Sequence, residues 1–243
     1  MKLIVNADDF GLSRGVNYGI VDAHELGIVT STTMLTNMPA TDHAFQLMEH
    51  YPDLQVGVHL TLTCGAPLTS DCPTLINQQG EFRLTSQFQR ATHEIDVEEV
   101  EKEWNAQIQQ FYTRGITPSH LDSHHHIHTW EPVIPVIKHL AQTYDLPVRT
   151  GFKQAPAGIR FWSDLLDTNF YKEGVNEDYF AELSQQYKGY DGTIEVMCHP
   201  AYIDETLKKY SSYVDDRARE LRVLTQVKQT VGNLLGKNEP TQT

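Results

Sequence analysis

Two adjacent carboxylates near the N-terminus are the first side chains that could carry chemistry. Asp8 and Asp9 follow the apolar run at 3–5 and precede Ser13, which predicts a strand that ends in a helix cap. Catalytic groups of α/β folds are mounted at such strand ends. Because side chains alternate along an extended segment, we expect Asp8 and Asp9 to point in opposite directions and to take different roles. One would hold a metal ion, and the other would face a reacting water.

A simpler interpretation treats both aspartates as solvated turn residues, with Gly11 supplying a positive φ. The histidines further along the chain favour the chemical interpretation. Five of the twelve histidines fall between His120 and His128, where a strand is expected to end. For any single one of them, a hydrogen-bonded loop is an adequate explanation.

Imidazole is the commonest protein ligand for divalent transition metals. The ends of three predicted strands offer Asp9, His59 and one member of the run His124–His126. Two imidazoles and one carboxylate leave coordination positions open for water and substrate, as a catalytic site requires. The sequence therefore predicts a metal site with one ligand from each of these positions.

A further histidine, His199, follows the predicted strand at 193–198 and precedes Pro200. If Asp8 is free of the metal, it can accept a proton from an attacking water while His199 donates one to a leaving group. Together they would form a hydrolytic acid/base pair.

The elements that must position these residues alternate along the chain. We predict strands at 3–5, 28–35, 55–60, 118–121, 146–149 and 193–198, and helices at 13–26, 41–51, 96–115, from 131, 177–187 and 214–235. Gly27 is expected to end the first helix, and Thr41 or Asp42 to cap the second. This alternation predicts a parallel sheet with right-handed crossovers. Residues 63–95 form a long excursion of the kind that is usually functional, and 150–176 has no clear assignment.

Length and composition allow one large domain or two small ones. Because the chain has no internal repeat and no convincing linker, we favour one domain over 1–243, with a polar tail at 236–243. The formal net charge of −13 argues against nucleic acid or an anionic membrane as a partner and favours an uncharged small substrate. The three cysteines form no CxxC pair, and the first apolar run is too short for a signal peptide. We therefore expect a soluble, cytoplasmic protein with reduced thiols.

Four motifs resemble the YdjC-type carbohydrate deacetylases, and the chitooligosaccharide (chitin disaccharide) deacetylases in particular. They are NADDFG at 6–11, GVHLTLT at 57–63, TPSHLDSHHH at 117–126 and EVMCHP at 195–200, in the same order as in that family. The resemblance implies an irregular, TIM-like (β/α) barrel with mostly parallel strands. It also implies a magnesium site and the removal of N-acetyl groups from chitin-derived oligosaccharides.

Residue by residue, the metal ligands of that family match Asp9, His59 and His124. Asp8 falls on the position of the catalytic base, and His199 on that of the acid, by similarity to polysaccharide deacetylases more broadly. These are the same two roles that the positions of Asp8 and His199 at strand ends suggest.

Three more residues are candidates for substrate binding or for support of the site. His126 could replace His124 at the metal if the loop rotates. Arg149, expected at the rim, either orients Asp8 electrostatically or pairs with a surface carboxylate. Trp130 either stacks on a sugar ring or packs in the core, and Trp104 is predicted to be core.

We therefore predict a metal-dependent amide hydrolase that releases acetate from oligosaccharides such as diacetylchitobiose in chitin-fragment catabolism. Ligand chemistry favours zinc, manganese, cobalt or iron, because imidazole suits the hard Mg²⁺ ion poorly, whereas the resemblance implies magnesium. The alternatives are a deacetylase of another N-acetylated sugar, a phosphoesterase, and a non-catalytic metal- or sugar-binding protein. A phosphoesterase needs cationic clamps, of which only Arg149 is clear. The expected partner is an N-acetylated oligosaccharide, and a homodimer is left open.

Overall fold

A single parallel sheet forms the centre of the protein. The computed structural model describes residues 1–83 and 95–228. Its strands are β1 (Lys2–Phe10), β2 (Ser31–Met34), β3 (Gln55–Leu60), β4 (Leu121–Ser123), β5 (Leu165–Asp167) and β6 (Thr193–Cys198). They lie in the order β4-β3-β2-β1-β6-β5, and every pair is parallel. The predicted parallel α/β sheet is confirmed.

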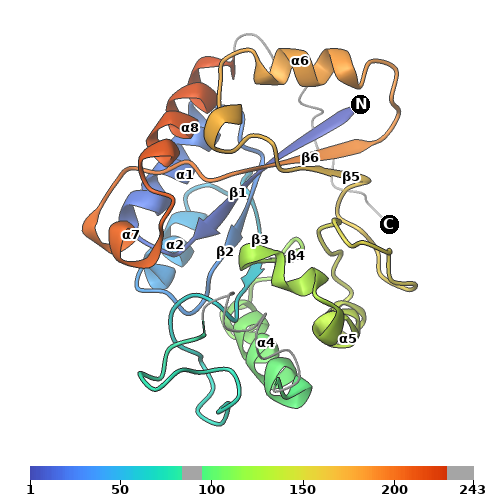
Figure 1. The fold of residues 1–243 in the computed structure, drawn as a ribbon. Helices are drawn as coiled ribbons and strands as arrows, with labels where there is room; N and C mark the ends of the chain where they lie inside the picture. Colours follow the sequence, from blue (N-terminus) through green and yellow to red (C-terminus); the bar gives the residue numbers. More distant parts are fainter. Residues whose placement is uncertain (84–94, 229–243) are drawn as a thin grey trace.

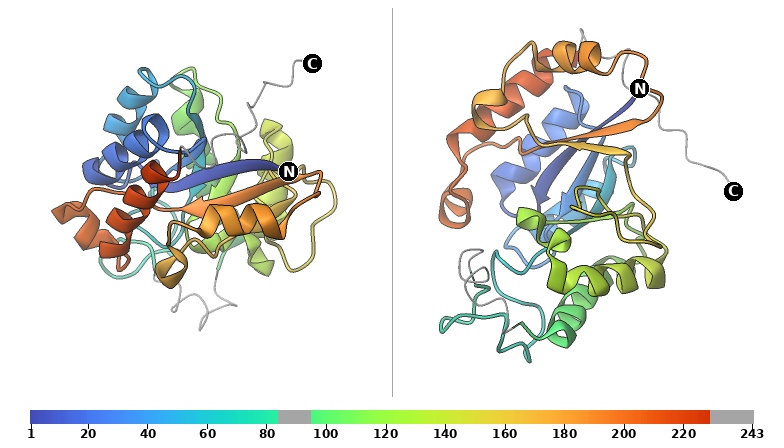
Figure 2. Two further views of the ribbon diagram at one scale, coloured as in Figure 1. Left: turned by 90° about the horizontal axis from the view of Figure 1, so that it is seen from above. Right: turned by 45° about the vertical axis from the view of Figure 1, so that its right-hand side comes forward.

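Helices cover the outer side of this curved sheet (Figure 1). They are α1 (Arg14–Glu25), α2 (Thr41–Met48), α4 (Val97–Tyr112), α5 (Ile134–Tyr144), α6 (Tyr179–Gln186), α7 (Glu205–Tyr210) and α8 (Asp215–Gln226). The described residues also form three short 3-10 helices, η1 (His124–Thr129), η2 (Glu131–Val133) and η3 (Lys172–Gly174). Helices α1, α2 and α8 group on one side of the sheet, and α4 and α5 on another (Figure 2).

The barrel wall is irregular between β4 and β5. Val148 makes single parallel bridges to Leu121 and to Phe161, and these bridges continue the wall beyond β4. The strand predicted at 146–149 is therefore wrong in extent, since Val148 is the one residue of this segment that forms β-bridges. Pro147 has no N–H to donate, which limits the ladder at this point. Six strands and two bridged segments thus make a TIM-like wall, as the resemblance implied.

Several predicted boundaries shift. Strand β1 extends through both aspartates to Phe10, β4 begins at Leu121 instead of 118, and α5 begins at Ile134 after η2. Neither Thr41 nor Asp42 caps α2, because the N-cap residue is Ala40. The predicted caps Ser13 and Asp96 do accept backbone hydrogen bonds at the starts of α1 and α4.

The C-terminal helix predicted at 214–235 corresponds to α8, while the preceding α7 was not predicted. Residues 229–235 and the predicted polar tail lie outside the described residues. Asp204 caps the start of helix α7, because its side chain accepts a hydrogen bond from the backbone N–H of Leu207 at 2.8 Å. The same side chain also accepts a hydrogen bond from the backbone N–H of Gly15 at 2.7 Å. The second of these bonds ties the start of α7 to α1.

Glycine and aromatic residues set the packing of the helices. Gly27 does not have the positive φ of a left-handed helix end. Instead it allows a close approach, since a Cβ there would lie 2.7 Å from the Leu224 carbonyl oxygen of α8. Trp104 is fully buried, as predicted.

Within the described ranges, no helix is long and apolar enough to cross a membrane.

The excursion after β3 is irregular over its described part, residues 63–83. Buried carboxylates of α4 hold it in place. Glu103 accepts hydrogen bonds from the backbone N–H groups of Leu68 and Thr69, at 3.0 and 2.9 Å, and Glu99 accepts one from Thr74 at 2.9 Å. The excursion is therefore anchored to the helix that follows it.

Candidate active site

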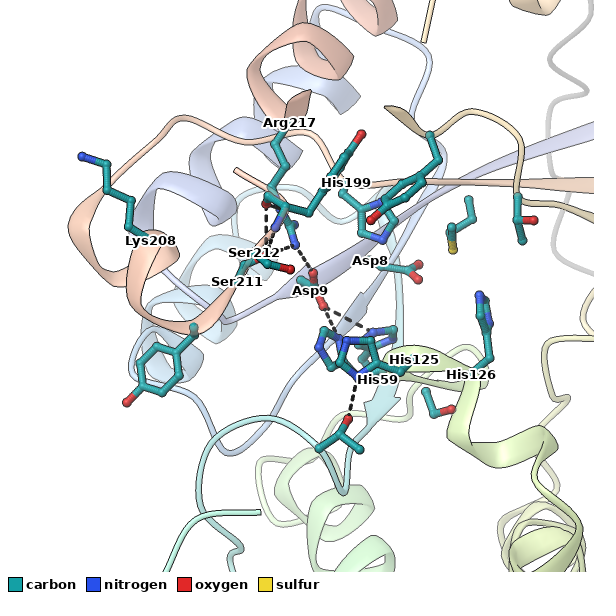
Figure 3. A pocket seen from close by; sticks show the side chains of 18 of the residues that line it. Asp8, Asp9, His59, His125, His126, His199, Lys208, Ser211, Ser212 and Arg217 are labelled. Atoms are coloured by element: carbon teal, nitrogen blue, oxygen red, sulfur yellow. Dashed lines mark hydrogen bonds and ion pairs between the residues drawn. The ribbon is translucent and has the colours of Figure 1, made fainter. Parts of the chain in front are cut away.

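A cavity of about 740 Å³ opens at the carboxyl ends of the strands. Its lining combines side chains from β1, β3, η1, the end of β6 and the turn between α7 and α8 (Figure 3). The predicted site residues among them are Asp8, Asp9, His59, His124, His126 and His199. The fold thus brings most of the predicted site together in one place.

A bulge in β1 aims both aspartates into this cavity. The pairing of β1 with β2 shifts register between Ala7 and Phe10, and Asp9 has a φ of 74°. Aspartate tolerates this left-handed conformation better than most residues, and bulges commonly re-aim side chains beside active sites. The expectation that Asp8 and Asp9 point in opposite directions is therefore wrong. They share the cavity but have different neighbours.

Asp9 lies between two imidazoles and a guanidinium group. Its Oδ1 is 2.9 Å from His124 Nδ1 and 3.4 Å from His59 Nε2, while its Oδ2 accepts a hydrogen bond from Arg217 Nη2 at 2.6 Å. Ligands bound to one ion at about 2.1 Å lie about 3.0–3.4 Å from each other. The three side chains therefore have the spacing of a metal ligand set.

The other ring nitrogen of His59 is held by Asp122. Its Nδ1 lies 2.7 Å from Asp122 Oδ1, and Thr33 Oγ1 donates to Asp122 Oδ2 at 2.9 Å. His59 and Asp122 are direct partners in the β3–β4 ladder. A carboxylate behind a histidine ligand fixes the ring so that its second nitrogen faces the ion. Donor type, spacing and this support all fit a divalent metal ion.

Asp8 is paired with Arg149. The guanidinium donates Nη1 to Oδ2 at 2.7 Å and Nη2 to Oδ1 at 2.6 Å, and Asn6 Nδ2 donates to Oδ1 at 2.9 Å. Burial alone would raise the pKa of Asp8, but the charge and hydrogen bonds of Arg149 hold this pKa well below its usual range. Asp8 is therefore an ionised, fixed carboxylate in the cavity wall.

Arg149 itself lies beneath the cavity and not at the rim, and it is fully buried. Besides Asp8 it contacts Asp122 Oδ2 at 2.8 Å and Glu195 Oε1 at 2.7 Å. Its partners are thus buried carboxylates and not a surface one. Burial raises the pKa of Glu195 to about 7 in spite of this pairing. Three buried carboxylates thus surround one guanidinium group.

His199 stands at the end of β6 against a stacked pair of tyrosine rings, with centroid distances of 5.8 Å to Tyr171 and 5.6 Å to Tyr213. Its backbone N–H donates to Glu220 Oε2, and its Nδ1 lies 3.8 Å from Glu220 Oε1. Tyr213 donates its hydroxyl to the same Oε1 at 2.6 Å. Because Nδ1 is buried without a hydrogen-bond partner, the other ring nitrogen is the one available to the cavity.

The histidines after His124 adopt an unusual backbone. His125 and His126 have φ values of 56° and 52°, and conformations of this kind at functional sites are often held by neighbouring contacts. His125 Nδ1 lies 2.9 Å from Thr63 Oγ1, which ties η1 to the excursion after β3. His126 lines the cavity, and burial lowers its pKa to about 4. His126 is therefore neutral at pH 7.

Trp130 lies elsewhere. It lines a separate surface cavity with Glu131 and Lys153, and it packs partly buried against the core. The packing interpretation of this residue is supported, whereas stacking on a sugar in the main cavity is not.

Sequence reasoning missed the residues that come from α8 and the turn before it. Arg217 reaches Asp9 across 208 positions of the chain, and no local pattern indicates such a contact. Lys208 and Lys209 also line the cavity, so the expectation that Arg149 is the clear cationic group there is wrong. Asp122 and Glu195 carried a usable signal, because each is a charged residue inside a buried strand.

The family model described as YdjC-like protein matches residues 2–230. The chain belongs to this family. A carbohydrate deacetylase of Halalkalibacterium halodurans is 75% identical over 229 residues, which cover 94% of this chain and 97% of the relative. A carbohydrate deacetylase of Geobacillus stearothermophilus is 46% identical, with 91% of this chain and 88% of the relative covered.

Two solved structures resemble the fold of this chain. A candidate cellobiose-phosphate cleavage protein from Enterococcus faecalis superposes with a TM-score of 0.88 at 34% identity, covering 96% of this chain and 94% of the other. A lactam utilization protein from Thermus thermophilus superposes with a TM-score of 0.55 at 14% identity, covering 96% of this chain and 98% of the other, and so shares the fold alone.

Proposed function

We propose that this member of the YdjC-like family is a metal-dependent carbohydrate deacetylase that releases acetate from chitooligosaccharides such as diacetylchitobiose. One observation carries the proposal. Two neighbouring carboxylates share a cavity, and one contacts imidazoles with ligand spacing while the other is held by a guanidinium group. The names of the close relatives support the deacetylase class.

In this proposal Asp9, His59 and His124 hold a divalent ion. Such an ion, when bound, polarises an acetamide carbonyl and lowers the pKa of water. The neutral nitrogen donors favour zinc or another transition metal, while the resemblance to chitooligosaccharide deacetylases implies magnesium. Asp122 keeps the His59 ring in the orientation that ligation needs.

Asp8 would act as the general base. Arg149 keeps it ionised, and each carboxylate oxygen has two acceptor sites, so the bonds to Arg149 and Asn6 do not use all of them. One remaining site can accept the proton of an attacking water. Asp8 can do so because it faces the cavity and is not part of the ligand set around Asp9.

His199 would act as the acid. Its cavity-facing nitrogen can donate a proton to the departing amine, while Glu220 lies 3.8 Å from Nδ1 on the other side of the ring. The stacked rings of Tyr171 and Tyr213 pack against the imidazole and limit where it can move. His126, neutral and in the wall, is available to bind the sugar.

The experiment that tests this function is an acetate-release assay on diacetylchitobiose, with mass spectrometry of the product. We expect the loss of an acetyl group and an unchanged oligosaccharide length. Free N-acetylglucosamine should react more slowly, because a single ring leaves much of the cavity unfilled and supplies less binding energy to position the amide. Cleavage of the dimer into single sugars, or equal rates for monomer and dimer, would contradict the substrate assignment.

The presence of Lys208 and Lys209 in the cavity wall calls for a second arm with a phosphorylated form of the disaccharide. Acetate release identifies a deacetylase in either arm, and phosphate release identifies a phosphoesterase. A non-catalytic binding protein would bind the sugar and release neither product.

A further inference from the structure

Arg217 is a buried side chain that none of the roles above uses. It lies in the first turn of α8 and is 2% exposed. Its Nη2 donates to Asp9 Oδ2 at 2.6 Å and lies 3.2 Å from Ser211 Oγ, and its Nε donates to the Tyr213 carbonyl oxygen at 2.7 Å. These contacts fix the guanidinium group beside one particular oxygen of Asp9 (Figure 3).

The two oxygens of Asp9 are therefore divided between different partners. Oδ1 faces His59 and His124, and Oδ2 faces Arg217. A carboxylate can bind an ion through one oxygen or through both. A short, charge-assisted hydrogen bond to Oδ2 competes directly with the second mode, because it occupies the oxygen that would complete a bidentate pair.

We propose that Arg217 is a positioning residue that restricts Asp9 to a single metal-binding oxygen. The coordination position that Oδ2 would otherwise fill stays free for water or substrate, as a catalytic metal site requires. The inference rests on the proposed function only through its metal site. It assigns Arg217 no contact with the substrate.

The test is the visible absorption spectrum of the Co²⁺-loaded protein, recorded without substrate. The d–d bands of Co²⁺ weaken as its coordination number rises. In Arg217→Met, Asp9 is free to bind through both oxygens, so we expect weaker bands with one Co²⁺ still bound per chain. Turnover should fall by about 10- to 100-fold, as is usual when a residue that supports a metal ligand is removed.

Two arginine variants serve as controls. Arg217→Lys keeps a cation within reach of Oδ2 and should retain a spectrum close to the original. Arg222→Met makes the same change as Arg217→Met on the same helix, but at a side chain that is 53% exposed and pairs with Glu177, and it should alter nothing. An unchanged spectrum in Arg217→Met, or loss of the ion from it, would overturn the proposal.

A crystal structure of the Co²⁺-loaded original protein keeps the inference testable even if Arg217→Met does not fold. We expect one Asp9 oxygen at bonding distance from the ion and the other on Arg217, and two oxygens at bonding distance would refute the inference. Neither measurement uses substrate. Failure of the acetate assay and failure of this inference are therefore distinguishable.

Discussion

Asp8 and Asp9 are chemically identical neighbours, yet the fold gives them different surroundings. Asp8 is held inside the barrel wall by Arg149 and Asn6, whereas Asp9 lies between the histidines of β3 and η1 and the guanidinium of α8. The bulge in β1 makes this division workable, because it turns both side chains toward one cavity. Contacts from distant strands and helices, more than residue type, thus distinguish the proposed metal ligand from the proposed base.

The largest expected effect comes from removing a ligand on the Asp9 side. His59→Ala should lose both the bound ion and the activity, because one of the two imidazoles at Asp9 Oδ1 is gone. Elemental analysis beside the acetate assay measures the two losses. His139→Ala is the matched control, since that side chain is 59% exposed and lies on the surface of α5. Full metal occupancy in His59→Ala would remove His59 from the ligand set.

A substitution of Asp8 should leave the metal content of the protein unchanged. In Asp8→Asn, Arg149 keeps Asp122 and Glu195 as partners, so the fold should persist. The amide cannot accept the proton, and turnover should fall by about 10²- to 10⁴-fold with unchanged metal content. Asp145→Asn, at a side chain that is 97% exposed, provides the control. Turnover near the original level would exclude Asp8 as the base.

The carboxylates around His59 also predict how many protons the site releases when a metal ion binds. Burial lowers the pKa of His59, but Asp122 and Asp8 raise it, to about 10 in the metal-free site. His59 is therefore protonated at pH 7, and an ion must displace that proton before the ring can bind it. We expect release of about one proton per ion and an affinity that rises about tenfold per pH unit between pH 7 and 9.

Titration calorimetry in two buffers of different ionisation enthalpy measures this proton release. Binding heats that are the same in both buffers would mean that His59 is already neutral, and they would contradict the charge assignment at the ligand set.

The smallest effect is expected from a substitution at Trp130, which lies near neither Asp8 nor Asp9. Because this ring lines a different cavity, Trp130→Ala should change kcat/KM on diacetylchitobiose by about 0.5 kcal/mol or less, a factor of about two. Acetate release by the folded variant provides the measurement. A loss of tenfold or more in kcat/KM would restore the sugar-stacking interpretation.

Patterns within short stretches predict much of this molecule. The alternation of strands and helices, the buried Trp104 and the delivery of Asp9, His59 and His124 to one edge of the sheet all follow from local periodicity and parallel topology. Local patterns do not predict the bulge at Asp9, because alternation assumes a regular strand. They also overestimate the strand at 146–149, where Val148 alone forms β-bridges to its neighbours.

Contacts between distant segments account for the rest. Local patterns place Arg149 at the rim, because nothing near it in the sequence indicates that Asp8, Asp122 and Glu195 will enclose it. Glu220 is hidden for the same reason, since its partner His199 lies on another element. The partners of such residues can be identified only when the strand order and the packing of α8 against α1 are known.

The reach of Arg217 to Asp9 also bears on how the protein is made. The two residues are 208 positions apart, so at about 5–20 residues per second the ribosome adds the arginine about 10–40 s after the aspartate. Throughout that interval the nascent chain carries a carboxylate destined for burial without its cationic partner. A chain that ends before α8 would retain the sheet sequence, yet Asp9 would lack the guanidinium that compensates its charge. The surroundings of Asp9 are thus completed only after all six strands of the described sheet have been translated.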